Sequence, residues 1–316
     1  TDSVPAPGSF VVVPFGPQSR IGIVWDRAVG ESDKPVDPKK LKAITGTLDT
    51  PPLPEITLRF AEWIAKYSLA PLGMVARMMM SAQTAFEPAK PRFGVAAVQG
   101  APVPPRVTPA RQRVLDIAAD GLIRPKSALA AEAGCTTGVV DGLVEAGCLA
   151  EVAIPEKGFR RPDPRYSAVE LSPDQEIAVH ALRSAVDAAN FSVSLIDGVT
   201  GSGKTEVYYE AVARALEAGR QVLIMLPEIA LTSQFMSRFE ARFGCPPVEW
   251  HSALSSPERG RIWKGVATGE ARVVVGARSA LFLPYPDLGL IVVDEEHDPS
   301  YKQQEGWRYH ARDLAV

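Results

Sequence analysis

The sequence has little cysteine, no signal segment and no long apolar run, and each absence excludes a class of protein. Only three of its 316 residues are cysteines, Cys135, Cys148 and Cys245. Because they are odd in number and far apart, they form neither a disulfide framework nor a paired zinc-binding motif. The opening residues, TDSVPAPGSF, lack both regions of a secretory signal. No apolar stretch approaches the roughly 18 residues of a membrane span. These absences predict a cytoplasmic protein with no membrane segment.

Charge of either sign is not in excess, and the composition is that of an ordinary globular protein. The formal net charge is -3, hydrophobic residues make up 46% and charged residues 22%. The overall charge therefore gives no sign of nucleic-acid binding. The length exceeds that of a single domain, for which about 150 residues is typical, so two or three domains are expected.

The front of the chain reads as a small β-rich domain. Residues 10–25 contain two β-branched and aromatic runs around a Gly-Pro turn, which predicts a hairpin. Two amphipathic helices are expected from Leu53 and from Pro71. Prolines then recur from residue 88 to residue 105 and predict an extended linker. We therefore expect the first domain to cover residues 1–105.

Three short helices followed by a strand are expected in residues 106–155, which is the pattern of a winged helix. The third of these helices nearly lacks lysine and arginine, although base readout depends on such side chains. Two interpretations stay open: a DNA-reading module, or a spacer that docks another protein. Residues 156–170 predict a second linker, basic and proline-bearing.

Strands alternate with helices in residues 171–316, which predicts an α/β lobe with a parallel sheet covered on both faces. The lobe begins with a capping box, in which Ser172 precedes Pro173 and Gln175 follows three residues after Ser172. The run SVSLI at 192–196 is expected to be its first strand. The fold class is therefore multidomain: a β-rich domain, a winged helix and a RecA-like P-loop lobe.

The strongest motif is GVTGSGKT at 198–205, which matches the phosphate-binding loop G-x-x-x-x-G-K-[ST]. Glycines let the backbone N–H groups converge on phosphates at the start of a helix. Lys204 then supplies a cation to the β and γ phosphates of ATP, and the hydroxyl of Thr205 binds Mg²⁺. The remaining nucleotide-binding residues expected in this loop are Gly198, Thr200, Gly201, Ser202 and Gly203.

A second motif is LGLIVVDEEH at 288–297, an apolar run that ends in adjacent carboxylates. Ligands of open α/β sheets bind at the carboxyl edge of the strands, where these carboxylates are expected to lie. Asp294 is expected to hold the Mg²⁺ and Glu295 to orient or deprotonate the attacking water. Lys204, Thr205, Asp294 and Glu295 are thus the predicted catalytic set.

Longer motifs resemble one family, the bacterial primosomal replication-restart DNA helicases of the PriA family. The resemblance is carried by LPEIALT at 226–232, GARSALF at 276–282 and DEEHDPSYKQQEGWRYHARDLA at 294–315. It covers essentially the whole chain, more loosely at the front. It implies an ATP-dependent 3′-to-5′ DNA helicase of the nucleoid that recognises stalled or forked DNA and initiates primosome assembly. It also implies single-strand DNA-binding protein and primosome-loading proteins as partners.

The resemblance assigns further residues to the two ligands. It makes Gln175 an adenine-recognising residue, in addition to its capping role. It places an aromatic-rich loop at Trp307 and Tyr309, where rings beside cations suit base stacking; core packing of these rings is the alternative. The residues so assigned to DNA are Pro227, Glu228, Arg278, Lys302, Trp307, Arg308 and Tyr309.

Two departures from the family pattern bear on function. The chain lacks the first strand and loop of the family's 3′-end domain. It also stops at Val316, where the family's second motor lobe follows, and it lacks the paired cysteines of the family's zinc module. Because that second lobe donates an arginine to the transition state, we expect this chain to bind nucleotide weakly and to hydrolyse it poorly.

Two other functions fit parts of the sequence. The first is a DNA-binding regulator in which the nucleotide site is a switch, the winged helix reads duplex DNA and no translocation occurs. The second is a small-molecule kinase, which leaves the winged helix and the DEEH strand unexplained.

Overall fold

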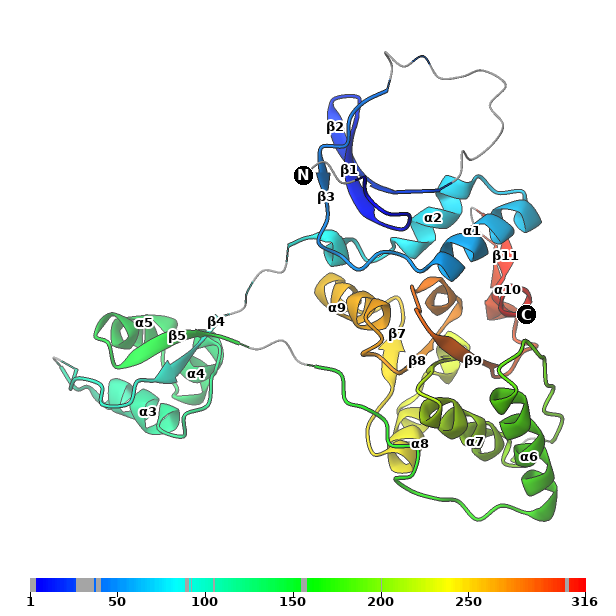
Figure 1. The fold of residues 1–316 in the computed structure, drawn as a ribbon. Coiled ribbons are helices and arrows are strands. Elements are labelled where there is room, and N and C mark those ends of the chain that lie inside the picture. The colour runs from blue at the N-terminus through cyan, green and yellow to red at the C-terminus, as the bar shows by residue number, and fades with distance from the viewer. Residues whose placement is uncertain are drawn as a thin grey trace. The chain divides into compact units, whose positions relative to one another are not determined.

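The computed structural model describes residues 4–26, 37, 41–88, 91, 93–104, 106–154, 158–199, 201–304 and 307–316. The chain forms two compact units (Figure 1). The first joins Thr1–Glu87 to Phe159–Val316, and the second is Pro88–Gly158. In the part that the structure describes, no helix has the length and apolar character needed to cross a bilayer.

The first unit begins with the predicted hairpin. Strand β1 pairs antiparallel with β2 on one side and with the short β3 on the other. Gly16, in the turn between β1 and β2, has a φ of 60°, which glycine adopts without strain. Two helices and a 3-10 turn follow the sheet. The bounds are β1 Phe10–Phe15, β2 Gln18–Ile23, β3 Gly46–Thr47, α1 Glu55–Ser68, α2 Leu72–Met79 and η2 Gln83–Phe86.

The rest of the first unit is an α/β lobe around a four-stranded sheet in the order β7-β8-β6-β9, in which every neighbouring pair is parallel. The predicted parallel sheet is confirmed. The bounds are α6 Pro173–Asp187, α7 Lys204–Glu217, β6 Gln221–Met225, η3 Glu228–Ala230, α8 Ser233–Phe243, β7 Val248–Trp250, α9 Ser256–Ala267, β8 Val273–Gly276, η4 Arg278–Phe282, β9 Leu288–Val293, η5 Pro299–Tyr301, β10 Lys302–Gln303, β11 Tyr309–His310 and α10 Ala311–Ala315.

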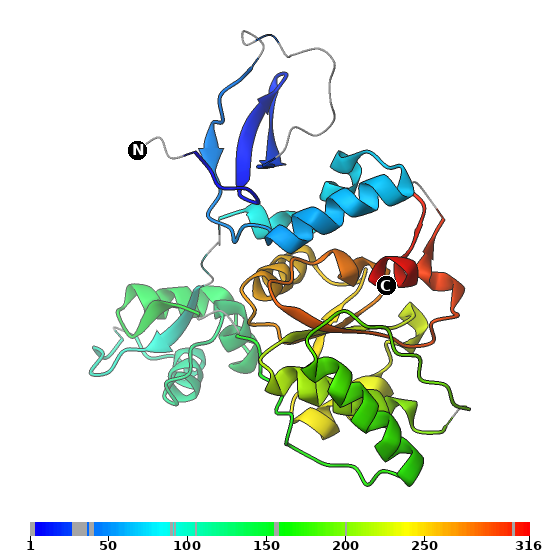
Figure 2. The ribbon, with the colours of Figure 1, turned by 45° about the vertical axis from the view of Figure 1, so that its right-hand side comes forward.

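Helices cover both faces of this sheet, as Figure 2 shows. Val222 and Ile224 of β6 point to one face, where they share a core with Phe239 of α8 and with residues of α7. The alternate residues Leu223 and Met225 point to the other face and share a core with α9. Since β6 is apolar from Val222 to Met225, burial on both sides explains this continuous hydrophobic run.

The strand expected at residues 192–196 is wrong. The structure has no strand there, and Val193 and Leu195 are 61% and 82% exposed. Among the described residues, β9 is an edge strand of the sheet and pairs only with β6, so no further strand lies beside it. Apolar alternation makes a segment suitable for a sheet, but a strand also needs a neighbour for its backbone N–H and C=O groups.

The N-terminal elements and the lobe share one core. The fully buried Trp263 of α9 lies with its ring centroid 5.6 Å from that of Phe10 and 5.1 Å from that of Phe86. Its indole N–H donates to the carbonyl oxygen of Met79 at 2.8 Å. The first 87 residues and the lobe, expected as separate domains, are therefore joined by buried contacts.

Gly260 of α9 allows the same close approach. A Cβ at this position would lie 2.9 Å from the backbone nitrogen of Ala85 and 3.0 Å from the backbone carbon of Thr84. Backbone atoms cannot rotate away, so we expect Gly260→Ala to lower the free energy of unfolding by about 1–3 kcal/mol. Urea denaturation measures this effect. The control is Gly73→Ala in α2, where a Cβ meets nothing within 4 Å; equal effects of the two substitutions would refute the close approach.

The second unit holds three helices and a two-stranded antiparallel sheet. Its elements are β4 Phe93–Ala97, α3 Pro109–Ala118, α4 Lys126–Glu132, α5 Thr137–Glu145 and β5 Leu149–Ala153. The domain boundary was expected at residue 106. Strand β4 lies before that residue and pairs along its whole length with β5, so it belongs to the second unit. The hydroxyl oxygen of Thr108 accepts from the backbone N–H of Arg111 at 3.3 Å and caps α3, as expected for a hydroxyl residue before proline.

Candidate nucleotide and DNA site

The glycine-rich loop ends at the first residue of α7, and its shape requires glycine. Gly201 and Gly203 have φ values of 83° and 81°. A Cβ at Gly203 would also collide with the side-chain amide of Gln175, and one at Gly198 would lie 2.6 Å from Ser202 Oγ. The first backbone N–H groups of α7 therefore open toward the loop, which is the arrangement that binds phosphate at helix N-termini.

Lys204 lies over this loop. Its Nζ donates to the carbonyl oxygens of Gly198 at 2.7 Å and of Val199 at 3.3 Å. The ammonium group is thus held beside the segment that would receive the phosphates. Thr200, the other expected loop contact, lies outside the described residues.

Gln175 joins α6 to the same loop. Its Oε1 accepts from the backbone N–H of Ser172 at 2.8 Å, which confirms the capping box. Its Nε2 donates to the carbonyl oxygen of Ser202 at 2.9 Å. Gln175 therefore lies beside the nucleotide loop, and its contact with adenine stays a prediction.

Asp294 follows the last residue of β9 and is held by several hydrogen bonds. Its Oδ2 accepts from the hydroxyl of Tyr208 at 3.0 Å, and its Oδ1 accepts from the backbone N–H of Glu295 at 3.0 Å. Its own carbonyl oxygen accepts from the hydroxyl of Tyr301 at 2.6 Å, and Tyr301 also donates to Met225 at the end of β6. These contacts fix both the backbone and the carboxylate of Asp294.

Glu295 has a φ of 49°, in the left-handed region of backbone conformation that residues other than glycine rarely adopt. Such a conformation costs on the order of 1 kcal/mol and persists only where the surroundings impose it. Its side chain is exposed, with Oε2 3.6 Å from Nε2 of His297. The chain thus turns sharply after Asp294 and presents the Glu295 side chain to solvent.

Sequence reasoning missed Tyr208 and Tyr301. Burial raises the pKa of the Tyr208 hydroxyl well above its usual value, and the nearby Asp294 carboxylate adds to the rise. Burial likewise raises the pKa of Tyr301. Both hydroxyls therefore stay protonated and act as donors to the DEEH segment. Tyr208 lies three residues after Thr205, so it falls on the same side of α7, which is the only signal that the sequence offers.

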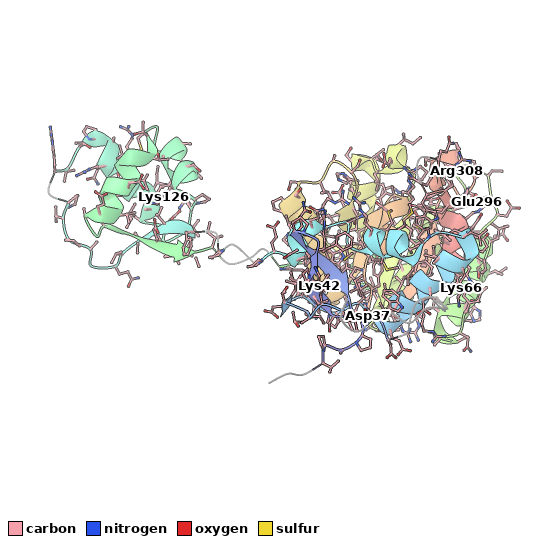
Figure 3. All side chains as sticks on the ribbon, turned by 90° about the horizontal axis from the view of Figure 1, so that it is seen from above. Asp37, Lys42, Lys66, Lys126, Glu296 and Arg308 are labelled. Carbon is pink, nitrogen blue, oxygen red and sulfur yellow. The ribbon has the colours of Figure 1, made fainter. Side chains whose placement is uncertain are left out.

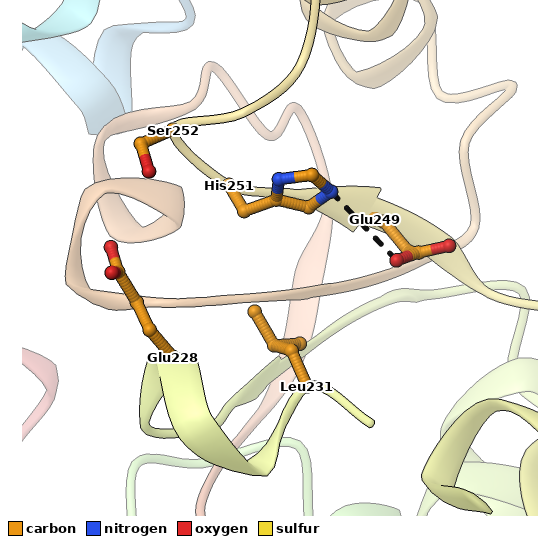
Figure 4. Close-up of a pocket in the computed structure, with 5 residues that line it drawn as sticks. All are labelled: Glu228, Leu231, Glu249, His251 and Ser252. Atoms are coloured by element: carbon orange, nitrogen blue, oxygen red, sulfur yellow. Dashed lines mark ion pairs between the residues drawn. The ribbon is translucent and has the colours of Figure 1, made fainter. Parts of the chain in front are cut away.

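The carboxyl ends of the strands also gather the residues expected to contact DNA. Glu228, after β6, and Arg278, after β8, line one hollow together with Asp298 and Ser300. Glu228 lines a second hollow with Leu231, Glu249, His251 and Ser252, drawn in Figure 4. In that close-up His251 points toward Glu249, and its Nε2 is 3.8 Å from Glu249 Oε2. His251 and Ser252, which the sequence did not single out, also line this hollow.

Arg278 and Tyr309 have structural partners. Arg278 Nη1 donates to the carbonyl oxygens of Ser300 at 3.0 Å and of Lys302 at 3.4 Å, and so holds the segment that follows DEEH. Tyr309 is 7% exposed and packs edge-on against Phe282, with ring centroids 5.3 Å apart. For Tyr309 the structure therefore favours the core-packing alternative over base stacking. Lys302 and Arg308 are exposed, and the half-buried Trp307 packs against Tyr309.

Comparison with known proteins first defines the class. Residues 1–81 match the family model of the 3′ DNA-binding domain, and residues 172–315 match that of the DEAD/DEAH box helicases. The chain is thus built from a DNA-binding domain and a helicase domain.

The particular proteins that the chain resembles are replication restart proteins named PriA. The chain is 37% identical to this protein from Haemophilus influenzae over 331 residues, covering 98% of the chain and 43% of the relative. It is 33% identical to the protein from Rickettsia felis, covering 98% of the chain and 36% of the relative. For the Bacillus subtilis protein the identity is 38%, over 62% of the chain and 25% of the relative. The predicted resemblance is confirmed, and the chain spans less than half the length of these relatives.

Proposed function

We propose that this chain forms the DNA-binding front and first motor lobe of an ATP-dependent 3′-to-5′ DNA helicase that recognises forked replication intermediates and initiates primosome assembly. One observation carries the proposal: Tyr208 of α7, the helix that begins at the phosphate loop, donates to Asp294 of the DEEH segment, 86 residues later. The match to a 3′ DNA-binding domain within the same compact unit supports DNA as the substrate.

The residues present fit ATP with Mg²⁺. The left-handed glycines and the ammonium of Lys204 suit a polyphosphate. The hydroxyl of Thr205 and the carboxylate of Asp294 are hard oxygen donors of the kind that Mg²⁺ prefers, and Tyr208 lies between them. Bound Mg²⁺ supplies positive charge to the phosphate oxygens, and Glu295 orients or deprotonates the attacking water. Gln175 receives the adenine edge.

Single-stranded DNA is proposed to cross the carboxyl ends of β6, β7 and β8. Pro227, Glu228 and Arg278 lie at these ends, and the exposed cations Lys302 and Arg308 attract the phosphates. Of the two rings expected to stack on DNA bases, Trp307 is the one that we still propose for this contact. From the family resemblance, the proposed location is the nucleoid in the cytoplasm. The proposed partners are single-strand DNA-binding protein and primosome-loading proteins.

The second unit, Pro88–Gly158, is proposed to be a winged helix that acts as a spacer or protein-docking module. Its three helices and paired strands suit that fold. Lys126, labelled in Figure 3, pairs with Asp141 at 2.8 Å and with Glu151 at 2.7 Å. Arg124 pairs with Asp120 and Glu132. These cations face carboxylates of the unit itself, which argues against duplex reading.

Binding of a fluorescent ATP analogue with Mg²⁺ tests the proposal, with the chain and with Lys204→Ala, each with and without forked DNA. We expect Lys204→Ala to weaken binding at least about tenfold, because one charge-assisted contact to phosphate contributes about 1.5–3 kcal/mol. Forked DNA is expected to strengthen binding by the unaltered chain.

Lys264→Ala, at a partly exposed position in the last turn of α9, is the matched control and should bind as the unaltered chain does. Binding that is indifferent to both Lys204→Ala and DNA would refute the nucleotide site. Preference for a specific duplex sequence over a fork would favour the nucleotide-switched regulator instead.

A further inference from the structure

Two adjacent tyrosines of α7 are buried, but only one meets the nucleotide site. Tyr208 is 4% exposed and Tyr209 fully buried. The hydroxyl of Tyr208 donates to Asp294 Oδ2 at 3.0 Å. The hydroxyl of Tyr209, by contrast, is buried and has no hydrogen-bond partner among the residues that the structure describes, and its ring packs against Phe239 and Phe243 of α8. One tyrosine therefore contributes polar contacts to the site, and its neighbour contributes only packing.

The hydroxyl of Tyr208 also interacts with the side chain of Thr205, one turn earlier on α7. Because the phenol has a single proton and donates it to Asp294, its interaction with Thr205 leaves the threonine hydroxyl as the donor. A threonine hydroxyl that donates its proton in this way keeps its lone pairs for a cation. The tyrosine thus orders both oxygen ligands of the proposed Mg²⁺ site, on two segments that the sequence separates widely.

We propose that Tyr208 is a positioning residue for the divalent cation that binds with the nucleotide: its hydroxyl holds the carboxylate of Asp294 and the hydroxyl of Thr205 in the orientation that the cation requires. The inference rests on the proposed function, since it assigns a role within the same site. Groups that orient metal ligands in this way typically change metal affinity by about 10-fold to 100-fold when they are removed. Tyr208 does not itself touch the nucleotide or the cation.

The experiment titrates Mg²⁺ into the chain with N-methylanthraniloyl-ATP, and repeats the measurement of nucleotide affinity in EDTA. For Tyr208→Phe we expect the half-saturating Mg²⁺ concentration to rise about tenfold, with the affinity in EDTA unchanged. Tyr209→Phe is the matched control, because it removes a neighbouring hydroxyl that has no partner, and it should leave both quantities unchanged. Electron paramagnetic resonance of Mn²⁺ measures cation binding independently of the fluorophore.

A merely structural role for Tyr208 would change both affinities together, or neither. An unshifted Mg²⁺ titration for Tyr208→Phe, or an equal shift in EDTA, overturns the inference while the proposed function stands. Failure of the unaltered chain to bind the nucleotide overturns both.

Thermal unfolding checks that Tyr208→Phe is folded, and a second variant tests whether its effect is transmitted through Asp294. In an Asp294→Ala background, Tyr208→Phe is expected to shift the Mg²⁺ titration by much less than tenfold, because only its contact with Thr205 remains. The full tenfold shift in that background would contradict an action through Asp294.

Discussion

Replacing Trp263 by alanine is expected to lower the free energy of unfolding by about 3–5 kcal/mol. The indole is fully buried and lies against the rings of Phe10 and Phe86. Its removal leaves a cavity, and it also leaves the carbonyl oxygen of Met79 without the indole donor. Urea denaturation followed by circular dichroism measures the change.

Trp63→Ala is the control, because Trp63 is 43% exposed and packs in a stack on the surface of α1, against Phe60 and Tyr67. We expect it to cost under about 1 kcal/mol. Limited proteolysis supplies a second measurement. Since Trp263 joins the front of the chain to the lobe, Trp263→Ala should speed cleavage between residues 87 and 159 and release of the first 87 residues. Equal losses from the two tryptophans would show that the shared core does not hold the parts together.

Most of the candidate nucleotide site could be proposed from the sequence because its motifs are local in sequence. The loop at 198–205 and the carboxylates after β9 follow from spacing and from the place of each motif on an element. The contact between Tyr208 and Asp294 was not predictable in this way, since it depends on how α7 and the end of β9 are positioned relative to each other in the fold. Buried tyrosines in an amphipathic helix give the same pattern whether or not their hydroxyls have partners.

Elements that depend on the periodicity of apolar residues were predicted from the sequence. Strands whose existence depends on pairing with a distant segment were not. Residues 192–196 have the alternation of a strand but no partner in the described structure. Conversely, β4 lies among prolines that predicted a linker, and its partner β5 follows some fifty residues later. Propensity records what one segment prefers, whereas a strand exists only with its neighbour.

The proposed DNA path and the nucleotide site meet in the segment 298–302. Tyr301 donates to the backbone of Asp294, while Arg278, at the carboxyl end of β8, holds the carbonyls of Ser300 and Lys302. Arg278 was expected to contact DNA directly. Its observed partners also tie the segment after DEEH to the carboxyl end of β8, beside the proposed DNA path.

Glu210 of α7 supports the nucleotide site from the opposite side of the helix, and its loss should be as costly as that of Trp263. The carboxylate is 8% exposed and pairs with Arg242 at 2.8 Å and with Arg183 at 2.6 Å. Arg242 is itself 6% exposed, and its Nη1 donates to the carbonyl oxygen of Pro164. Glu210→Ala leaves a buried guanidinium without its counter-charge, so we expect the free energy of unfolding to fall by about 3–5 kcal/mol in urea denaturation.

Glu206→Ala, one turn earlier on α7, is the matched control. Glu206 pairs with Arg238 at 2.7 Å, but both side chains are partly exposed, and such a pair contributes about 0–1 kcal/mol. Adding Arg242→Met to Glu210→Ala should recover part of the loss, because the uncompensated charge is then gone. A cost for Glu210→Ala no larger than that for Glu206→Ala would contradict a buried charge network. Helix α7 also begins with Lys204 and carries Tyr208. We therefore expect Glu210→Ala to weaken nucleotide binding, although Glu210 itself is not proposed to contact the nucleotide.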